Sequence, residues 1–335
     1  MARYDFASDN TSGMAPEALA ALGQFNGGFV AGYGGDPVTA RAADAIRALL
    51  DADAEVRFVY SGTAANALCL SWLARPHEAV LAHEHAHVVG DECGAPQAFG
   101  AGMSIVPVPG PAGRIDPKAL QAILDQPEQT RFQPPVALSL TNATEYGTVY
   151  SADEIAALTG PAKAKGLTVH LDGARLCGAA AAGFPMTRLK DLDIDMLVIG
   201  GTKAGTLPSE AVVLFDKSLA RRFDTRVKQV GQLASKARFL SAPWIGMLES
   251  GAWIGRAAHA NAMARKLAAL TPFPLAHPVE ANGVFMIMPD DALARLNAAG
   301  WTIYRFTDGS ARFLCSWATT EASVEELGEA LKAVA

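Results

Sequence analysis

The sequence lacks several features that would assign it at once to a common class of protein. No apolar run reaches the roughly 18 residues of a membrane-spanning helix, and the opening MARYDFASDN holds no apolar signal-peptide core. Positive charge is scarce: 28 Lys and Arg stand against 34 Asp and Glu, giving a net charge of −6. Because nucleic-acid binding needs basic patches, we expect neither a nucleic-acid nor a membrane partner.

Paired cysteines are also missing. The four cysteines form no CxxC motif and lie far apart, at Cys69, Cys93, Cys177 and Cys315. This spacing favours reduced thiols in a cytoplasm over a disulfide framework or a zinc ribbon.

What the 335 residues do have is a globular balance, 50% hydrophobic and 19% charged. Up to residue 240, short apolar runs alternate with helix-like stretches, and several runs are continuous, as in strands buried on both faces. The expected strands cover 56–60, 79–83, 103–108, 135–140, 167–172, 195–200 and 211–215. The alternation predicts an α/β fold with a mostly parallel sheet in a large domain over residues 15–240.

Helical patterns complete this outline. The expected helices include 117–126 and 151–166, the second with a capping-box signature at Ser151 and Glu154. After residue 240 a long helical stretch (245–270) precedes apolar segments near 282–288 and 311–317 and a final helix from residue 323. This pattern predicts a linking helix and a smaller α+β domain over 241–335.

A single lysine lies among glycines in VIGGTKAG, residues 198–205. A P-loop would need a glycine directly before the lysine and Ser or Thr after it, and neither is present. A Rossmann glycine pattern is also absent, since SGTAAN has one glycine. Lys203 is therefore either a solvated turn residue or a nucleophile that forms a Schiff base with pyridoxal phosphate (PLP).

The other groups that PLP needs have candidates. Asp172, which ends an expected strand in HLDGAR and precedes Lys203 by 31 residues, would face the pyridine nitrogen. The turn SGTAAN (61–66) would receive the phosphate at a helix N-terminus. His83, His85 or His87 would stack on the ring. Each piece has a plainer interpretation, because DG is common in turns and Ser-Gly-Thr is a common helix cap.

The motifs SDNTSG, YGGDPVTAR, SGTAANAL, HAHVVGDECGAP, HLDGARL, GGTKAG, KQVGQLASKARFLSAPW and EANGVF occur here in this order. Together they resemble the threonine aldolases of the β-eliminating lyase group, PLP enzymes of the aspartate-aminotransferase fold type. The resemblance runs nearly from end to end, from residue 6 to residue 317. It implies the fold-type-I, PLP-dependent transferase-like architecture for the large domain and an N-terminal segment (1–14) that contributes to the active site.

The resemblance also implies roles for individual residues. Lys203 would hold PLP as a Schiff base, Asp172 would pair with the pyridine nitrogen, and His87 would lie on the ring face. The phosphate would be bound by Gly62, Thr63 and Thr202.

The resemblance further implies a substrate site and shared subunits. Ser8, Arg175 and Arg312 would hold the substrate carboxylate, with Arg175 also close to the cofactor. Tyr33, near the substrate, and Lys228, near the cofactor, would reach in from a neighbouring chain. This implies a homo-oligomer, either a dimer or a tetramer.

One loop departs from the family pattern. Many relatives have a histidine in the loop after the fourth strand, whereas here that loop reads NATEYGT, with Glu145 near the position. The departure leaves the handling of the substrate hydroxyl proton open. We take His87 as the first candidate for the base, because imidazole titrates near neutral pH.

The alternating HEHAH (83–87) has two interpretations. In an extended strand His83, His85 and His87 would share one face and could form a metal trio. No further ligand cluster accompanies them, so no metal is expected. Glu92 either supports His87 or is a surface charge.

The function expected from the resemblance is cleavage of β-hydroxy-α-amino acids to glycine and an aldehyde. The alternatives are a phenylserine-type aldolase or a β-eliminating PLP lyase of the same fold, and a non-catalytic PLP-binding protein.

Overall fold

The runs expected to be strands form one seven-stranded sheet in the computed structural model, which describes residues 2–335. Its strands are β1 (Glu55–Val59), β2 (Ala79–His83), β3 (Ser104–Val108), β4 (Pro135–Thr141), β5 (Thr168–Gly173), β6 (Met196–Gly200) and β7 (Glu210–Leu214). They lie in the order β1-β7-β6-β5-β4-β2-β3. β7 is antiparallel to both neighbours and the other four pairs are parallel, so the mostly parallel sheet is confirmed.

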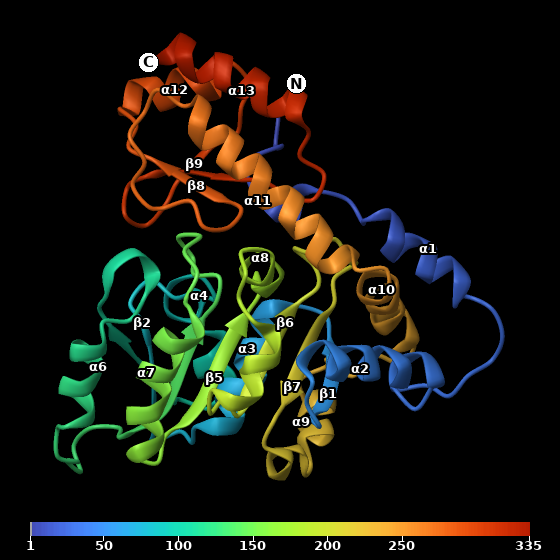
Figure 1. Ribbon diagram of the computed structural model, residues 1–335. Helices are drawn as coiled ribbons and strands as arrows, with labels where there is room; N and C mark the ends of the chain where they lie inside the picture. The colour runs from blue at the N-terminus through green and yellow to red at the C-terminus, as the bar shows by residue number, and fades with distance from the viewer. Residues whose placement is uncertain (1) are drawn as a thin grey trace.

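Helices cover both faces of this sheet (Figure 1). One side carries α3 (Gly62–Leu73) and α9 (Phe223–Gln229), and the other carries α2 (Pro37–Leu50), α7 (Ala152–Ala164) and α8 (Leu176–Ala181). In β6, Met196 and Val198 pack in the cluster of α3, whereas Leu197 and Ile199 pack in the cluster on the opposite face. Burial on both faces therefore explains the continuous apolar runs.

The expected helix starts are confirmed. Ser151 Oγ accepts the Glu154 N–H at 3.2 Å and the Glu154 carboxylate accepts the Ser151 N–H at 2.7 Å, a capping box that begins α7. The helix expected over 117–126 is α6 (Pro117–Leu124), capped by Asp116. Shorter helical pieces are α4 (His87–Gly90), α5 (Ala95–Phe99), η2 (Pro111–Gly113), η3 (Met186–Asp191) and η4 (Lys217–Ala220).

A second sheet of three antiparallel strands lies apart from the first, at the top of Figure 1. Its strands are β8 (Gly283–Met286), β9 (Tyr304–Arg305) and β10 (Ala311–Leu314), in the order β8-β10-β9, with α12 (Asp290–Ala298) and α13 (Glu321–Val334). These elements share a separate cluster of buried side chains. The strands expected near 282–288 and 311–317 and the final helix are therefore confirmed.

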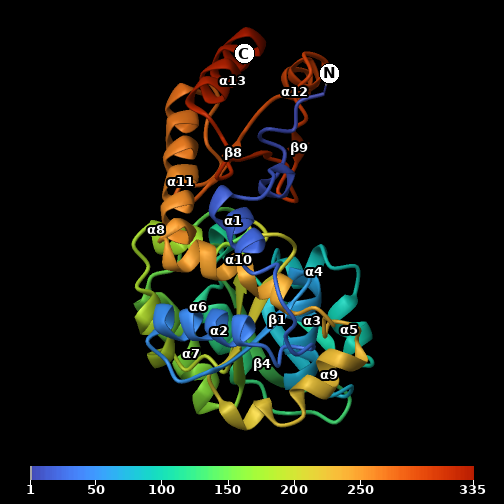
Figure 2. The same ribbon diagram turned by 90° about the vertical axis from the view of Figure 1, so that its right-hand side faces the viewer.

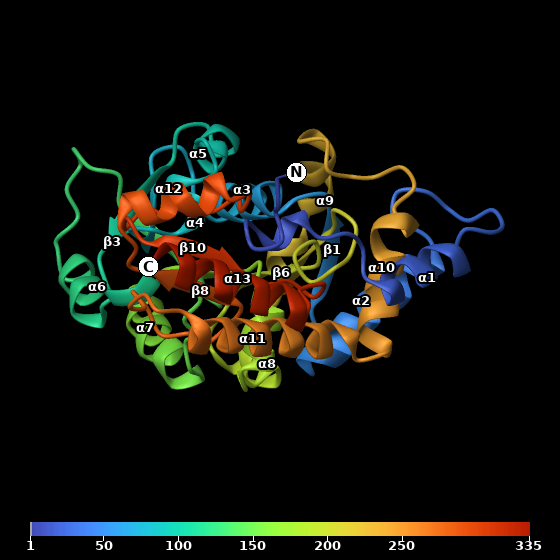
Figure 3. The ribbon, with the colours of Figure 1, turned by 90° about the horizontal axis from the view of Figure 1, so that it is seen from above.

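The helical region expected over 245–270 consists of two helices separated by a glycine. α10 (Arg238–Glu249) ends before Gly251, whose φ of 74° is left-handed, and α11 (Ala252–Leu270) begins after it. α11 then runs from the large sheet to the small one (Figure 2) and lies beside α13 (Figure 3). Neither α11 nor any other helix described in residues 2–335 is long and apolar enough to cross a membrane.

The N-terminal segment connects the two parts of the molecule. Arg3 exchanges backbone hydrogen bonds with Gly300 and Thr302, at 2.8 and 2.9 Å, and Phe6 is buried in the cluster of the small sheet. The chain continues through η1 (Asp9–Thr11) to α1 (Pro16–Gln24), which packs on α10. The residues around η1 therefore pass between the two sheets.

Replacing Gly251 by alanine is expected to lower the free energy of unfolding by about 1 kcal/mol, because a Cβ is disfavoured at positive φ. Gly255 is the matched control, since it lies inside α11 and a Cβ there would meet no atom within 4 Å. Gly255→Ala is expected to raise the free energy of unfolding by roughly 0.5–1 kcal/mol. Urea denaturation measures both, and equal stabilisation by the two changes would contradict this account of the helix break.

Candidate active site

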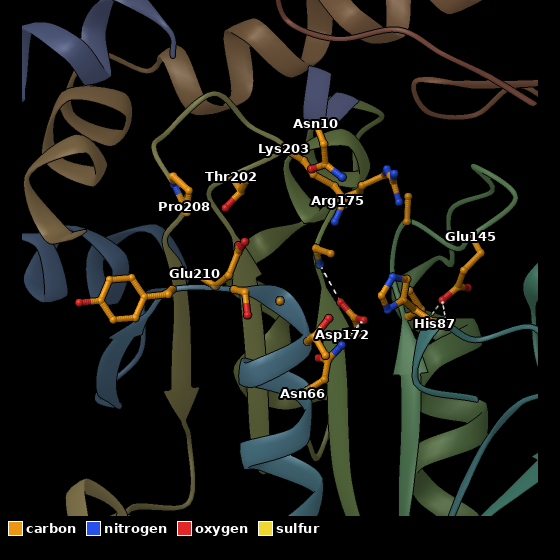
Figure 4. Close-up of a pocket in the computed structure, with 17 residues that line it drawn as sticks. Asn10, Asn66, His87, Glu145, Asp172, Arg175, Thr202, Lys203, Pro208 and Glu210 are labelled. Atoms are coloured by element: carbon orange, nitrogen blue, oxygen red, sulfur yellow. Dashed lines mark hydrogen bonds between the residues drawn. The ribbon is translucent and has the colours of Figure 1, made fainter. Parts of the chain in front are cut away.

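A cavity of about 270 Å³ opens at the carboxyl ends of β4, β5 and β6, where ligands of open α/β sheets bind. Figure 4 shows the side chains that converge on it from these strand ends and from α3. The cavity brings together all but one of the residues expected to bind PLP, namely Gly62, Thr63, His87, Asp172, Arg175, Thr202 and Lys203.

Asp172 ends β5 and is 3% exposed. Its Oδ1 accepts the Ala174 N–H at 2.9 Å and its Oδ2 accepts an N–H of the Asn66 amide at 2.7 Å. Two donors hold this carboxylate in a fixed orientation. An anion fixed in this way suits the protonated nitrogen of a pyridine ring.

Lys203 lies in a tight turn directly after β6. The N–H groups of Ala204 and Thr206 both donate to the Gly201 carbonyl, at 3.0 Å. A Cβ at Gly200 would collide with the Ala174 carbonyl, and a Cβ at Gly201 would collide with the Ser209 carbonyl. The two glycines of GGTK are therefore required by close packing beneath the lysine.

The N-terminus of α3 faces the same cavity. Ser61 caps the helix, with its Oγ accepting the Ala64 N–H at 3.3 Å, and Ser61, Gly62 and Thr63 line the cavity. A Cβ at Gly62 would meet no atom within 4 Å, so space is open beside the first helical turn. The first amides of a helix lack intrahelical acceptors and favour anions, so this end fits a phosphate group.

His87 has carboxylates on both sides of its ring. Its Nδ1 lies 2.9 Å from Glu92 Oε1, and its Nε2 lies 3.5 Å from Asp91 Oδ2. The hydrogen bond to Glu92 raises the pKa of His87 although burial opposes this. Glu92 is 4% exposed and contacts His87, so it is not a surface charge.

The three histidines of HEHAH do not lie along one extended strand, because β2 ends at His83 and α4 begins at His87. His83 Nε2 lies 3.0 Å from the Gly110 carbonyl and His85 Nδ1 lies 2.7 Å from the Tyr146 hydroxyl. Each ring thus has a different partner. Among residues 2–335 no group of three or more His, Cys, Asp or Glu side chains is arranged to hold a metal ion.

Glu145 also lines the cavity, close to His87. Its Oε1 accepts the His87 backbone N–H at 2.8 Å and the Thr141 hydroxyl at 3.2 Å. Its Oε2 is buried and receives no hydrogen bond from a described residue. Burial raises the pKa of Glu145 to about 7.

A second cavity of about 370 Å³ adjoins the first and shares His87, Glu145, Arg175 and Lys203 with it. The three residues expected to hold the substrate carboxylate, Ser8, Arg175 and Arg312, all line it. We call this space the substrate cavity and the first one the cofactor cavity.

The two arginines of the substrate cavity differ in their partners. Arg175 makes a bidentate pair with buried Asp9, at 2.7 and 2.9 Å, and Asp9 also accepts a hydrogen bond from Asn282 at 3.1 Å. Arg312 has a buried Nε without a hydrogen-bond partner among the described residues. Burial, followed by the charge of Arg175, lowers the pKa of Arg312. An uncompensated guanidinium of this kind suits a bound carboxylate.

Tyr33 and Lys228 are not brought into this site. Neither lines the two cavities, and the Lys228 ammonium lies 4.5 Å from the centre of the Tyr33 ring. The two residues expected to serve a neighbouring chain are thus adjacent to each other.

Sequence reasoning missed several polar groups at the site. Asn66 and Asp9 lie inside the motifs SGTAANAL and SDNTSG, and Asn66 stands one helical turn after Gly62, on the same helix face. That spacing was the available signal for Asn66. Glu210 gave no signal in the sequence, since it begins an apolar strand. In the structure Glu210 lines the cofactor cavity and accepts the Gly201 N–H at 2.8 Å. Burial raises the pKa of Glu210.

Comparison with known proteins agrees with this geometry. Residues 5–291 match the model of the β-eliminating lyase family. The chain belongs to this family.

Three proteins that match this chain over nearly its full length are threonine aldolases. A low specificity L-threonine aldolase of a Pseudomonas species is 45% identical over 98% of this chain and 97% of its own length. One from Pseudomonas aeruginosa is 44% identical over the same shares. The solved threonine aldolase structure of Leishmania major has a TM-score of 0.93 and 32% identity, over 99% of this chain and 100% of that one.

These findings confirm the expected family and the fold-type-I architecture. The threonine aldolases and the β-eliminating lyase family are PLP-dependent, so this chain is a PLP-dependent lyase with the cofactor expected from the sequence.

Asp9→Asn is expected to lower the free energy of unfolding by about 3 kcal/mol at pH 7, because it leaves the Arg175 cation buried without its partner. Glu17→Gln is the control, since the Glu17–Arg256 pair is 30% exposed on both sides. The control is expected to cost less than about 1 kcal/mol. Denaturant titration compares the two variants. An equal loss of unfolding free energy in both would contradict the role of Asp9 as the buried partner of Arg175.

The cost of Asp9→Asn should also depend on pH. Although burial opposes it, Arg175 lowers the pKa of Asp9 in the folded chain. The pair therefore stabilises the fold fully above the unfolded carboxyl pKa of about 3.9 and progressively less as the pH falls below it. The difference in the free energy of unfolding between wild type and Asp9→Asn should become smaller below about pH 4. A difference that stays constant with pH would exclude this link between stability and the titration of Asp9.

Proposed function

We propose that the chain cleaves β-hydroxy-α-amino acids of the L-threonine and L-allo-threonine type to glycine and an aldehyde. The observation that carries this proposal is the adjacency of two cavities, one with Lys203 and Asp172 and the other with Arg312 and Ser8. The names of the two full-length Pseudomonas relatives, both low specificity L-threonine aldolases, support it.

The residues of the cofactor cavity fit PLP. Lys203 would hold it through a Schiff base, Asp172 would face the ring nitrogen, and His87 would lie against the ring. Gly62, Thr63 and Thr202 would bind the phosphate, with the open space beside Gly62 as the cradle. When bound, PLP supplies a conjugated ring that takes up the electron pair released at Cα.

The residues of the substrate cavity orient the amino acid. Arg312, whose Nε is unpartnered, would bind the substrate carboxylate together with Ser8 and the free edge of Arg175. A fixed carboxylate determines how the bonds at Cα are oriented, and this orientation decides whether Cα–Cβ or Cα–H breaks.

Two related activities remain as alternatives within this site. A phenylserine-type aldolase would release an aromatic aldehyde, and a β-eliminating lyase would release ammonia and a keto acid. A non-catalytic PLP-binding protein is less well supported, because Lys203, Asp172 and Arg312 all line the two adjoining cavities.

We also propose that the chain works as a homo-oligomer, a dimer or tetramer, in the cytoplasm. The loop before α2 carries exposed Phe29, Val30 and Tyr33, and such apolar exposure is typical of an interface. Tyr33, together with Lys228, would then complete the site of a neighbouring copy. The four free thiols accord with a reducing compartment.

Lys203→Ala is expected to abolish the visible absorption of lysine-bound PLP and to lower turnover by roughly 10³-fold or more. Asp172→Asn should retain the absorption and lower turnover by at least roughly 10²-fold. The assay measures glycine and acetaldehyde from L-threonine and L-allo-threonine, with benzaldehyde from phenylserine alongside. Lys118→Ala, an exposed lysine on α6, is the control. Ammonia and a keto acid in place of glycine would favour the elimination alternative.

Shared sites predict complementation between inactive variants. Lys203→Ala and Lys228→Ala are each expected to have low activity alone. A hybrid oligomer of the two variants, however, contains complete sites in which Lys203 comes from one copy and Lys228 from another. Co-expression with two affinity tags and assay of the doubly tagged fraction measures this. Activity in the hybrid no higher than in the parents would show that Lys228 serves its own chain.

A further inference from the structure

Glu145 is fixed by one carboxylate oxygen only and, unlike Glu92, whose buried Oε2 is also without a partner among the described residues, it lines both cavities. Glu145 Oε1 accepts two hydrogen bonds, from the His87 backbone N–H and the Thr141 hydroxyl, at 2.8 and 3.2 Å. Glu145 Oε2 is buried, and no described residue donates to it. Because buried polar atoms are nearly always hydrogen-bonded, an oxygen left over in a cavity wall indicates a ligand partner.

The position of Glu145 indicates which part of a ligand this is. Glu145 lines both cavities, together with Lys203 and Arg175, whereas Arg312 lines the substrate cavity alone. A substrate with its amino group toward Lys203 and its carboxylate toward Arg312 has Cβ beside the wall that the two cavities share. The β-hydroxyl is the group of such a substrate that needs an acceptor there.

His87 is the competing acceptor, and both its ring nitrogens already have neighbours. Nδ1 is hydrogen-bonded to Glu92, and Nε2 lies 3.5 Å from an Asp91 carboxylate oxygen. Two flanking carboxylates stabilise the protonated imidazolium, which has no free electron pair for another proton.

On the basis of the aldolase function proposed above, we infer that Glu145, and not His87, takes the proton of the substrate's β-hydroxyl group. In cleavage the O–H bond breaks and its proton binds to Glu145 Oε2. The O–H electron pair becomes the second bond of the aldehyde carbonyl, and the Cα–Cβ pair leaves with the glycine fragment. A proton from solvent then binds at Cα and completes glycine, and Glu145 returns its own proton to solvent. In the reverse direction Glu145 donates its proton to the aldehyde oxygen.

The electrostatics of the site agree with this role. Burial, aided by the nearby charge of Asp172, raises the pKa of Glu145 to about 7, while the hydrogen bond from His87 opposes the rise. Arg175 lies in the same walls as a cation. A group that titrates near neutral pH can both accept and return a proton. Since the ionised form is the base, cleavage should fall as the pH drops below this value.

The test is Glu145→Gln in the holoenzyme, because the amide oxygen still accepts from the His87 N–H while the base is lost. We expect kcat for L-threonine cleavage to fall by at least roughly 10²-fold, and its acid limb to disappear. Exchange of the glycine α-proton in deuterium oxide needs no hydroxyl base, so NMR should find it within about threefold of wild type. Glu128→Gln, an exposed carboxylate that lines neither cavity, is the matched control.

The possible outcomes separate the hypotheses. Cleavage retained by Glu145→Gln, or equal loss of cleavage and exchange, would overturn the role of Glu145. Should the glutamine variant not bind PLP, Glu145→Asp takes its place, with cleavage again expected to fall more than exchange. Exchange of glycine protons by a wild type that releases no aldehyde from any β-hydroxy-α-amino acid would instead refute the aldolase function itself.

Discussion

Burial of carboxylates at one edge of the large sheet is the constraint on which the site depends. Asp172, Glu92, Glu145 and Glu210 lie in or directly beside the cofactor cavity. Buried carboxylates destabilise a fold unless donors surround them. Here the donors are three backbone N–H groups that follow the strands, together with the Asn66 amide, the Thr141 hydroxyl and the His87 ring. The segments that follow the strands therefore supply part of the donors that make the burial of these carboxylates possible.

Asn66 joins two halves of this arrangement. Its amide nitrogen donates to Glu92 Oε1 at 2.8 Å and to Asp172 Oδ2 at 2.7 Å. The opposite amide orientation would place a carbonyl oxygen against two carboxylates, so the amide has one stable orientation. Because Glu92 also bonds His87, one chain of hydrogen bonds connects the ring-face histidine with the partner of the pyridine nitrogen. A change of charge at either end acts on the other through this amide.

Local patterns were sufficient for the strands of the large sheet and the capped helices, because continuous apolar runs and cap residues act over a few positions. They failed where tertiary contacts decide. The alternation of HEHAH left a shared face open as one alternative, but β2 ends at His83, and the rings of His83 and His85 contact different segments. Gly251 interrupts a stretch with helical periodicity, since its backbone is left-handed. The pair of Asp9 with Arg175 joins residues 166 positions apart, beyond the reach of any periodicity.

The loop that carries Glu145 is packed against side chains from the part of the molecule that holds the small sheet. Tyr146, the next residue, packs against Phe306 and His277 with ring centres 5.2 and 4.2 Å apart, and its hydroxyl contacts His85. This aromatic contact anchors the loop between the two parts of the molecule. Since burial is the main cause of the raised pKa of Glu145, any opening of the small sheet would lower that pKa. The packing of the two parts therefore contributes to the proton affinity of Glu145.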